Sequence, residues 1–293
     1  MDGDRHRRGN HQTMPYFTSG LSRLYYEDIG EGPPVILAHG VGGNHASWFN
    51  QVPTLSARYR TIAIDHRAFG NSEDVEGIGA SGYVEDLARL LDALKLDRVF
   101  LVAQSMGGGT CAGFTCRGPE RVSALVHADS LAGIVLPDPW GEQLKALNTA
   151  NDGLSQAERV LGPVIRASDP ERTYLYLQIA SFNSVSRKTL KGRMEPWSPQ
   201  ALAATGVPVM FVAGEHDVLC PPELLRIVHE AVPGSRFEVI AGAGHSAYFE
   251  APEAFNPLLL GFLESIAAPR REKPRAARKR VMRPRSLRRL RRA

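Results

Sequence analysis

The sequence predicts an α/β fold with a mostly parallel central sheet flanked by helices. Short runs rich in Val, Ile, Leu and Phe recur and alternate with segments of helical spacing, which is the rhythm of parallel strands with covering helices. Several of these runs are apolar at successive positions, as strands buried on both faces must be. The chain has 293 residues and is 43% hydrophobic, so it can bury the core of one large domain, with or without an insertion.

Seven strands and three helices can be placed from these patterns. The strands are expected at Arg23–Tyr26, Pro34–Ala38, Arg60–Ile64, Arg98–Ala103, Ala124–Ala128, Pro208–Ala213 and Arg236–Ile240. The helices are expected at Ser81–Leu94, Pro222–Ala231 and Pro252–Ala267. The first helix has five apolar residues on one face, and the second begins with a proline, which suits a first helical turn.

A helical cap is expected between two of the strands. From residue 136 to 205 no strand-like run appears, and Ala, Leu, Gln and charged residues dominate together with several aromatic residues. The predicted organisation is a core of residues 14–135 and 206–268, from which this insertion projects at the strand ends. Open α/β sheets bind their ligands at that edge.

The two ends of the chain differ from the rest. Residues 1–13 are polar and unpatterned, which predicts a flexible extension and a natural start at Met14. Residues 269–293 contain thirteen basic residues and one acidic residue, whereas the rest of the chain has 22 basic and 30 acidic residues. Self-repulsion predicts that this tail is disordered. It could bind polyanions, but no specific nucleic-acid partner is predicted.

The sequence carries no membrane or disulfide signal. No apolar run approaches the roughly 18 to 20 residues that cross a bilayer, and the N-terminus lacks the apolar segment of a secretory signal. A cytoplasmic location is therefore expected. Cys111, Cys116 and Cys220 show no metal-ligand spacing, so buried thiols are expected, and no metal or cofactor is predicted.

Ser105 has the sequence context of a nucleophile. An apolar run ends in Ala103-Gln104-Ser105-Met106-Gly107, and small residues two before and two after a serine allow a strand to turn sharply into a helix. The serine is then held exposed at the bend. The pattern differs from G-x-S-x-G at its first position, where Ala103 replaces glycine. A flexible glycine-rich loop is the alternative interpretation of these residues.

A serine nucleophile needs a histidine that takes its proton and a carboxylate that orients the histidine. Asp217 follows the sixth expected strand, and His245 follows the seventh. Strand ends on one edge of a parallel sheet converge in space, so Ser105, Asp217 and His245 are expected to meet. Asp129, at the end of another strand, and Glu215 are alternative candidates for the acid.

The chain order of these three residues is that of the α/β-hydrolase family, and other segments also resemble this family. His39-Gly40-Val41-Gly42 resembles its oxyanion-loop motif. Asp65–Ser72 resembles its D-x-R-G-x-G-x-S turn, with Ala68 in place of a glycine, and Gly244–Phe255 resembles its G-H-x-x-x-x-E-x-P-x-x-F segment. The conjunction of these motifs, in order over residues 20–267, implies an α/β-hydrolase fold with a helical cap.

The resemblance also implies two backbone donors for an oxyanion hole. The N–H of Met106 lies at the start of the helix after Ser105, where free donors and the positive end of the dipole favour negative charge. Val41 holds the position of the family's usual second donor. His39 is expected to brace this loop rather than bind a metal, and His66 is expected in a turn.

The predicted function is hydrolysis of a small carboxylic ester or lactone through an acyl-enzyme, with Ser105, Asp217 and His245 as the triad. The similar enol-lactonases, cofactor-free haloperoxidases or perhydrolases and carbon–carbon bond hydrolases share this apparatus, and specificity is expected to reside in the insertion. A serine at the elbow argues against haloalkane dehalogenases and epoxide hydrolases, whose nucleophile is a carboxylate.

Two other classes of function compete with this prediction. Gly107–Ala112 fits G-x-G-x-x-A, and Asp129 follows the next strand, as in a dinucleotide-binding fold. In such folds the glycines follow the strand directly, whereas four residues make the bend here, and Asp217 and His245 would have no role. A non-catalytic binding protein on the same scaffold predicts a lost triad member, and none is lost.

Overall fold

A single eight-stranded sheet forms the centre of the molecule. The computed structural model describes residues 15–267, so the predictions for residues 1–13, for Met14 and for residues 269–293 lie outside the described residues. The strand order is β1-β2-β4-β3-β5-β6-β7-β8, with β2 antiparallel to both of its neighbours, β1 and β4, and all other neighbouring pairs parallel. The strands are β1 (Tyr16–Ser19), β2 (Ser22–Ile29), β3 (Pro34–Ala38), β4 (Arg60–Ile64), β5 (Val99–Gln104), β6 (Val122–Ala128), β7 (Val209–Gly214) and β8 (Arg236–Ile240).

The central strands are buried on both faces, which explains their apolar sequences. β5 and β7 are buried at every position, and β3 and β4 at every position except the first. Only parallel strands that are covered on both sides need such continuous apolar runs. The prediction of an α/β fold with a mostly parallel sheet is therefore confirmed.

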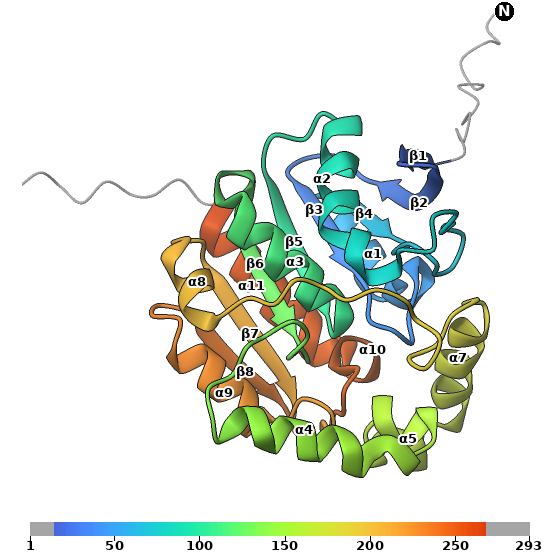
Figure 1. The fold of residues 1–293 in the computed structure, drawn as a ribbon, viewed down its shortest axis with the longest axis vertical. Helices are drawn as coiled ribbons and strands as arrows, with labels where there is room; N and C mark the ends of the chain where they lie inside the picture. The colour runs from blue at the N-terminus through green and yellow to red at the C-terminus, as the bar shows by residue number, and fades with distance from the viewer. Residues whose placement is uncertain (1–14, 268–293) are drawn as a thin grey trace, which may run out of the picture.

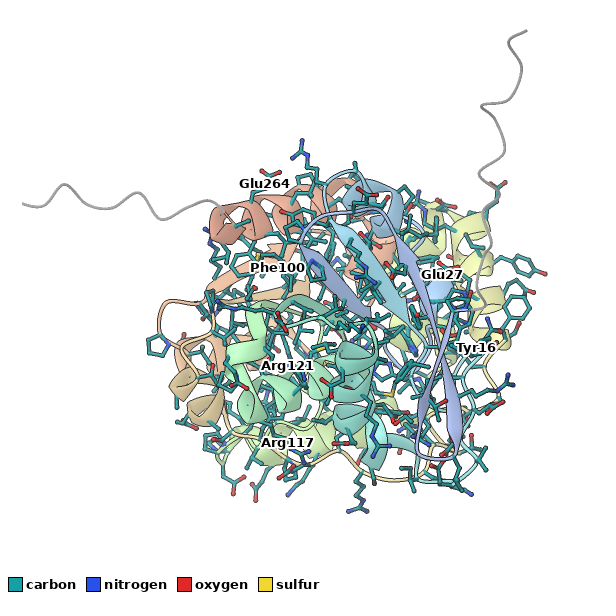
Figure 2. The ribbon with its side chains drawn as sticks, turned by 90° about the horizontal axis from the view of Figure 1, so that it is seen from above. Tyr16, Glu27, Phe100, Arg117, Arg121 and Glu264 are labelled. Carbon is teal, nitrogen blue, oxygen red and sulfur yellow. The ribbon has the colours of Figure 1, made fainter. Side chains whose placement is uncertain are left out.

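Helices cover both faces of the sheet (Figure 1). One face packs on α2 (Tyr83–Ala93), α3 (Met106–Arg117), α8 (Pro199–Ala204) and α9 (Pro222–Glu230), and the other packs on α1 (Gln51–Ser56), α10 (Ala247–Glu250) and α11 (Pro252–Ala267). Figure 2 shows Arg117 of α3 and Glu264 of α11 on opposite sides, with Phe100 of β5 between them. Among residues 15–267, no helix is both long enough and apolar enough to cross a membrane.

Four further helices lie at the carboxyl ends of the strands. They are α4 (Trp140–Ala150), α5 (Gln156–Val160), α6 (Pro163–Ser168) and α7 (Pro170–Ser181). Figure 1 shows α4 and α5, in green, along the bottom edge below the ends of β6 and β7, and α7, in yellow, at the right. The last helix between residues 136 and 205, α8, instead packs on the sheet through Leu202. Short 3-10 helices lie at His45–Trp48, Gly79–Gly82, Pro119–Arg121 and Asn151–Gly153.

The turn after β4 has an unusual backbone that bears on the stability of the fold. Ala68 has a φ of 71°, in the left-handed region that glycine adopts at little cost. Gly70 also has a positive φ, and a Cβ on it would lie 2.2 Å from a carboxylate oxygen of Asp65. That carboxylate accepts hydrogen bonds from the N–H groups of His45 and Asn71, which holds the turn closed.

Candidate active site

Ser105 lies in a sharp turn between β5 and α3. Its φ of 50° and ψ of −118° fall outside the regions that L-residues normally adopt, so the surrounding structure must impose this conformation. The N–H of Ser105 donates to the carbonyl of Ala128 at 3.0 Å, and the hydroxyl of Ser130 donates to the Ser105 carbonyl at 2.6 Å. The neighbouring strand β6 and the loop after it therefore hold the serine in its strained position.

Glycines allow two segments to approach this turn closely. A Cβ on Gly107 would lie 2.2 Å from the carbonyl oxygen of Ala38, and one on Gly40 would lie 2.8 Å from the Cβ of Ser105. Ala103, which replaces the first glycine of the motif, is fully buried in β5, where its methyl group is accommodated. The sharp turn therefore requires glycine after the serine and tolerates alanine before it.

The structure brings Ser105, Asp217 and His245 together. The Nε2 atom of His245 lies 2.8 Å from the Ser105 hydroxyl, and Nδ1 lies 2.9 and 3.0 Å from the two carboxylate oxygens of Asp217. One of these oxygens also accepts the N–H groups of Leu219 and Cys220 at 2.8 and 2.9 Å. These donors fix the carboxylate, which in turn fixes the ring of the histidine.

The two other candidate acids have different partners. Asp129 accepts hydrogen bonds from the N–H groups of Gly214 at 2.8 Å and Ala247 at 3.2 Å. Burial, and then the nearby charge of Asp217, raise the pKa of Asp129 well above its usual value. Glu215 is half-exposed and accepts a backbone N–H of the loop after β8. The carboxylate that bonds to His245 is therefore that of Asp217, which the resemblance to the α/β-hydrolase family favours.

Glu250 holds the loop that carries His245. One carboxylate oxygen accepts the N–H groups of Gly162 at 2.8 Å and Gly244 at 2.9 Å, and the other accepts that of Ser246 at 3.1 Å. Burial raises the pKa of Glu250 in spite of these three donors. Gly162 belongs to the cap segment, so this one side chain joins the cap to both residues that flank His245. Sequence reasoning missed this role, although the glutamate of the family motif was a signal.

Gln104 makes a second link to the same loop. Its side-chain amide is buried and donates to the carbonyl of His245 at 2.6 Å. Gln104, the residue before Ser105, therefore helps to position His245, which bonds to the Ser105 hydroxyl. Nothing in the local sequence distinguishes Gln104 from an ordinary strand residue, because its partner lies 141 positions away.

The two candidate oxyanion donors lie in different elements: Val41 in the loop after β3, and Met106 at the start of α3. Neither Val41 nor Met106 donates a backbone hydrogen bond within residues 15–267, as expected at a loop and at a first helical turn. The loop of Val41 is braced by His39, whose ring accepts the N–H of His66 at 3.0 Å and contacts the Gly40 carbonyl at 2.7 Å. Burial lowers the pKa of His39 to about 4, so its ring is neutral and acts through hydrogen bonds.

Two cavities open on the Ser105 hydroxyl. The larger chamber has a volume of about 390 Å³ and the smaller chamber one of about 190 Å³. Both are lined by Ser105, His245, Arg159, Arg187 and Leu219. The two arginines come from the cap, and they are absent from every motif that predicts the site. Together the chambers provide space beside Ser105 that a small molecule could enter.

The same region offers one group of atoms that could in principle bind a metal. Asp217, Cys220 and His245 present ligand atoms that lie within 4.8 Å of one another. However, the carboxylate and the imidazole already bond to each other, and burial together with the charge of Asp217 raises the pKa of the Cys220 thiol well above its usual value. A neutral thiol is a poor metal ligand, so these residues fit a hydrogen-bonded triad better than a metal centre.

The glycine run after Ser105 is packed against the protein itself. A Cβ on Gly108 would lie 2.3 Å from the hydroxyl of Ser130, and one on Gly109 would lie 2.7 Å from the sulfur of Met194. A dinucleotide-binding fold needs its glycines to face a pyrophosphate. Here neighbouring segments of the chain occupy that space, so the match to G-x-G-x-x-A has a packing explanation.

Comparisons with known proteins agree with this geometry. A family model described as alpha/beta hydrolase fold matches residues 33–252. The chain belongs to the α/β-hydrolase fold family. The match covers strands β3 to β8, the loops that carry Ser105, Asp217 and His245, and the helices between β6 and β7. The resemblance inferred from the motifs is confirmed.

Several members of the α/β-hydrolase family are similar over most of this chain. The RutD protein of Azorhizobium caulinodans, which is named as a carbamate hydrolase, is 27% identical and covers 86% of this chain and 99% of its own. The BpoC protein of Mycobacterium tuberculosis, named as a non-heme bromoperoxidase, is 29% identical, and the match covers 85% of this chain and 100% of BpoC. A solved structure of Est816, described as degrading N-acyl homoserine lactones, has a TM-score of 0.71 at 25% identity, and the match covers 85% of this chain and 100% of Est816. The chain is thus a hydrolase-fold enzyme with relatives of several activities.

Proposed function

We propose that the protein hydrolyses a small carboxylic ester or lactone through an acyl-enzyme on Ser105. The observation that carries this proposal is the pair of hydrogen bonds that joins the serine hydroxyl to His245 and His245 to Asp217. Such a chain of bonds turns a weakly nucleophilic hydroxyl into an effective one. The similarity to a lactone-degrading structure supports the same class of substrate.

The geometry suggests how each group contributes. His245 takes the proton of Ser105 through Nε2 as the hydroxyl attacks the carbonyl carbon, while Asp217 holds the ring in the tautomer that leaves Nε2 free to accept. The N–H groups of Val41 and Met106 would donate to the developing oxyanion. His245 then gives its proton to the leaving oxygen, and later activates the water that releases the acid.

Substitution of the serine and the histidine tests this proposal. Ser105→Ala and His245→Ala are each expected to reduce turnover of a short-chain 4-nitrophenyl ester by at least about 10³-fold, since each breaks the same proton transfer. Ser181→Ala, an exposed serine of α7, is the matched control and should keep full activity. Circular dichroism checks that each variant is folded. Ester turnover retained in folded Ser105→Ala protein would refute the mechanism.

A second candidate activity uses the same triad with a different acceptor. The similarity to BpoC, at 29% identity, favours transfer of the acyl group to hydrogen peroxide, which would form a peracid in place of the acid. A panel of esters, lactones and carbamates, each assayed with and without peroxide, separates these activities. Dominant oxidation of a halide in the presence of peroxide and a carboxylic acid would favour the second candidate over the first.

A further inference from the structure

Two arginines of the cap line both chambers beside Ser105. Arg159 lies in α5, and Arg187 lies in the segment after α7. Among the described residues that line the chambers, no carboxylate is present to balance them. The walls around the serine are therefore cationic, although the core and cap together carry more acidic than basic residues.

The two guanidinium groups differ in their partners. Arg187 pairs with Asp152 at 2.6 Å, and both side chains are about half exposed, at 44% and 57%. Arg159 has no carboxylate within 4.0 Å among residues 15–267, and its Nε atom is buried without an acceptor. Burial, and then the charge of Arg187, lower the pKa of Arg159. Because the guanidinium of Arg159 lines both chambers and has no carboxylate partner among the described residues, its charge is available to an anionic ligand.

We propose that Arg159 binds a free carboxylate of the substrate, and that the substrate is an ester or lactone that carries this second acidic group. This inference rests on the acyl chemistry proposed for Ser105. Arg159 and Arg187 with Asp152 leave one net positive charge, which matches a singly charged carboxylate better than a doubly charged phosphate. The planar fork of a guanidinium also fits the two oxygens of a carboxylate.

The arrangement of the chambers supports this assignment. Because Ser105 and Arg159 both belong to the walls of each chamber, a substrate whose carbonyl reaches the serine can place its carboxylate on the arginine from either side. The larger chamber adds the neutral side chains of Gln156 and Asn183 to its wall. Arg159 is therefore a specificity-determining residue in this proposal, and it takes no part in the proton transfers at Ser105.

A pair of substrates that differ only in charge tests the proposal. Mono-(4-nitrophenyl) glutarate carries a free carboxylate, and its methyl ester has the same leaving group and nearly the same length without the charge. In Arg159→Gln protein, the ratio of kcat/KM for the anionic over the neutral substrate should fall about 10- to 100-fold, the range for a lost charge-assisted hydrogen bond. Arg159→Lys keeps the charge without the fork and should give an intermediate ratio. The ratio cancels any loss of folded enzyme.

Arg193→Gln is the matched control, because this exposed arginine lies in the same segment and lines neither chamber. It should leave the ratio at the wild-type value. An unchanged ratio in Arg159→Gln protein would overturn the proposal while leaving the esterase proposal standing. Ester turnover that survives in Ser105→Ala protein would instead overturn the esterase proposal.

Calorimetric titration with glutarate provides a readout that needs no turnover. The wild-type protein should bind glutarate, and Arg159→Gln should weaken this binding at least about tenfold. Equal binding by both proteins, or no binding by the wild type at millimolar glutarate, would count against a carboxylate site at Arg159 even if no ester were hydrolysed.

Discussion

Glu250→Gln should reduce both the stability of the protein and its activity, because one carboxylate organises the loop around His245. The two oxygens of Glu250 accept three N–H groups, from Gly162, Gly244 and Ser246. Glutamine has almost the same shape but only one acceptor oxygen. If that oxygen takes the pair from Gly162 and Gly244, the amide NH₂ faces the N–H of Ser246, and two donors then oppose each other.

The size of the effect follows from these contacts. One buried N–H loses its acceptor, at a cost of about 1–3 kcal/mol, and two bonds lose the charge of their acceptor, at about 1 kcal/mol each. Part of this loss is recovered, because burial raises the pKa of Glu250 and the neutral amide avoids the cost of burying a charge. We expect the free energy of unfolding to fall by about 2–3 kcal/mol.

Activity should fall through displacement of His245. Gly244 and Ser246 flank this residue, so loosening them changes the distance from Nε2 to the Ser105 hydroxyl, which is 2.8 Å in the native structure. Small displacements of reacting groups cost up to about 10²-fold in rate, and we expect kcat/KM for a 4-nitrophenyl ester to fall about 10-fold or more.

Urea denaturation and steady-state kinetics of the same preparations measure both effects. Glu230→Gln makes the identical atomic change at an exposed position at the end of α9 and should alter the stability by less than about 0.5 kcal/mol. If Glu250→Gln matches this control in stability and keeps wild-type kcat/KM, then the three hydrogen bonds do not organise the site and the reasoning is wrong.

Two further predictions concern stability. Ala68→Gly should raise the free energy of unfolding by about 1 kcal/mol and the Tm by about 2–4 °C, because the φ of 71° is costly for alanine; an unchanged or lower Tm in calorimetry would contradict this. The raised pKa of Asp129 means that the folded state holds its proton more tightly than the unfolded chain, so the stability it contributes is complete below about pH 4 and is lost as the pH rises through its folded pKa. The unfolding free energy of the wild type minus that of Asp129→Asn should therefore fall from pH 4 to pH 8. A difference that is constant with pH would exclude this linkage.

The sequence predicts the strands of the core closely, because burial on both faces leaves a local pattern. Three strands, β3, β4 and β8, have the expected bounds, and β5, β6 and β7 differ by at most two residues at either end. The sequence does not predict β1, since this short strand is only half-buried and depends on pairing with β2. The helix α1 is also missed, because six residues are too few to show a helical period.

The triad could be predicted for a similar reason. Ser105, Asp217 and His245 each follow a strand that the pattern places, and a parallel sheet brings such strand ends to one edge. The contacts that orient these three residues could not be predicted in the same way. Gln104 and Glu250 act on groups that are distant in sequence, such as the Gly162 N–H, which lies 88 positions from its acceptor. Local patterns carry no information about such pairs.

Ser105, Asp217 and His245 lie on the sheet, whereas the charged side chains that line the chambers come from the cap, and this difference bears on specificity. The triad sits on the rigid sheet, where the strained backbone of Ser105 and the buried partners of Asp217 leave little freedom to change. The arginines that line the chambers, Arg159 and Arg187, come instead from the segment between β6 and β7. Glu250 joins the two parts through Gly162, so the cap is positioned by the same carboxylate that positions His245. A change of substrate by substitution in the cap is therefore expected to succeed at Arg159 and Arg187, which line the chambers, and to fail at Gly162, where the cap and the histidine share one anchor.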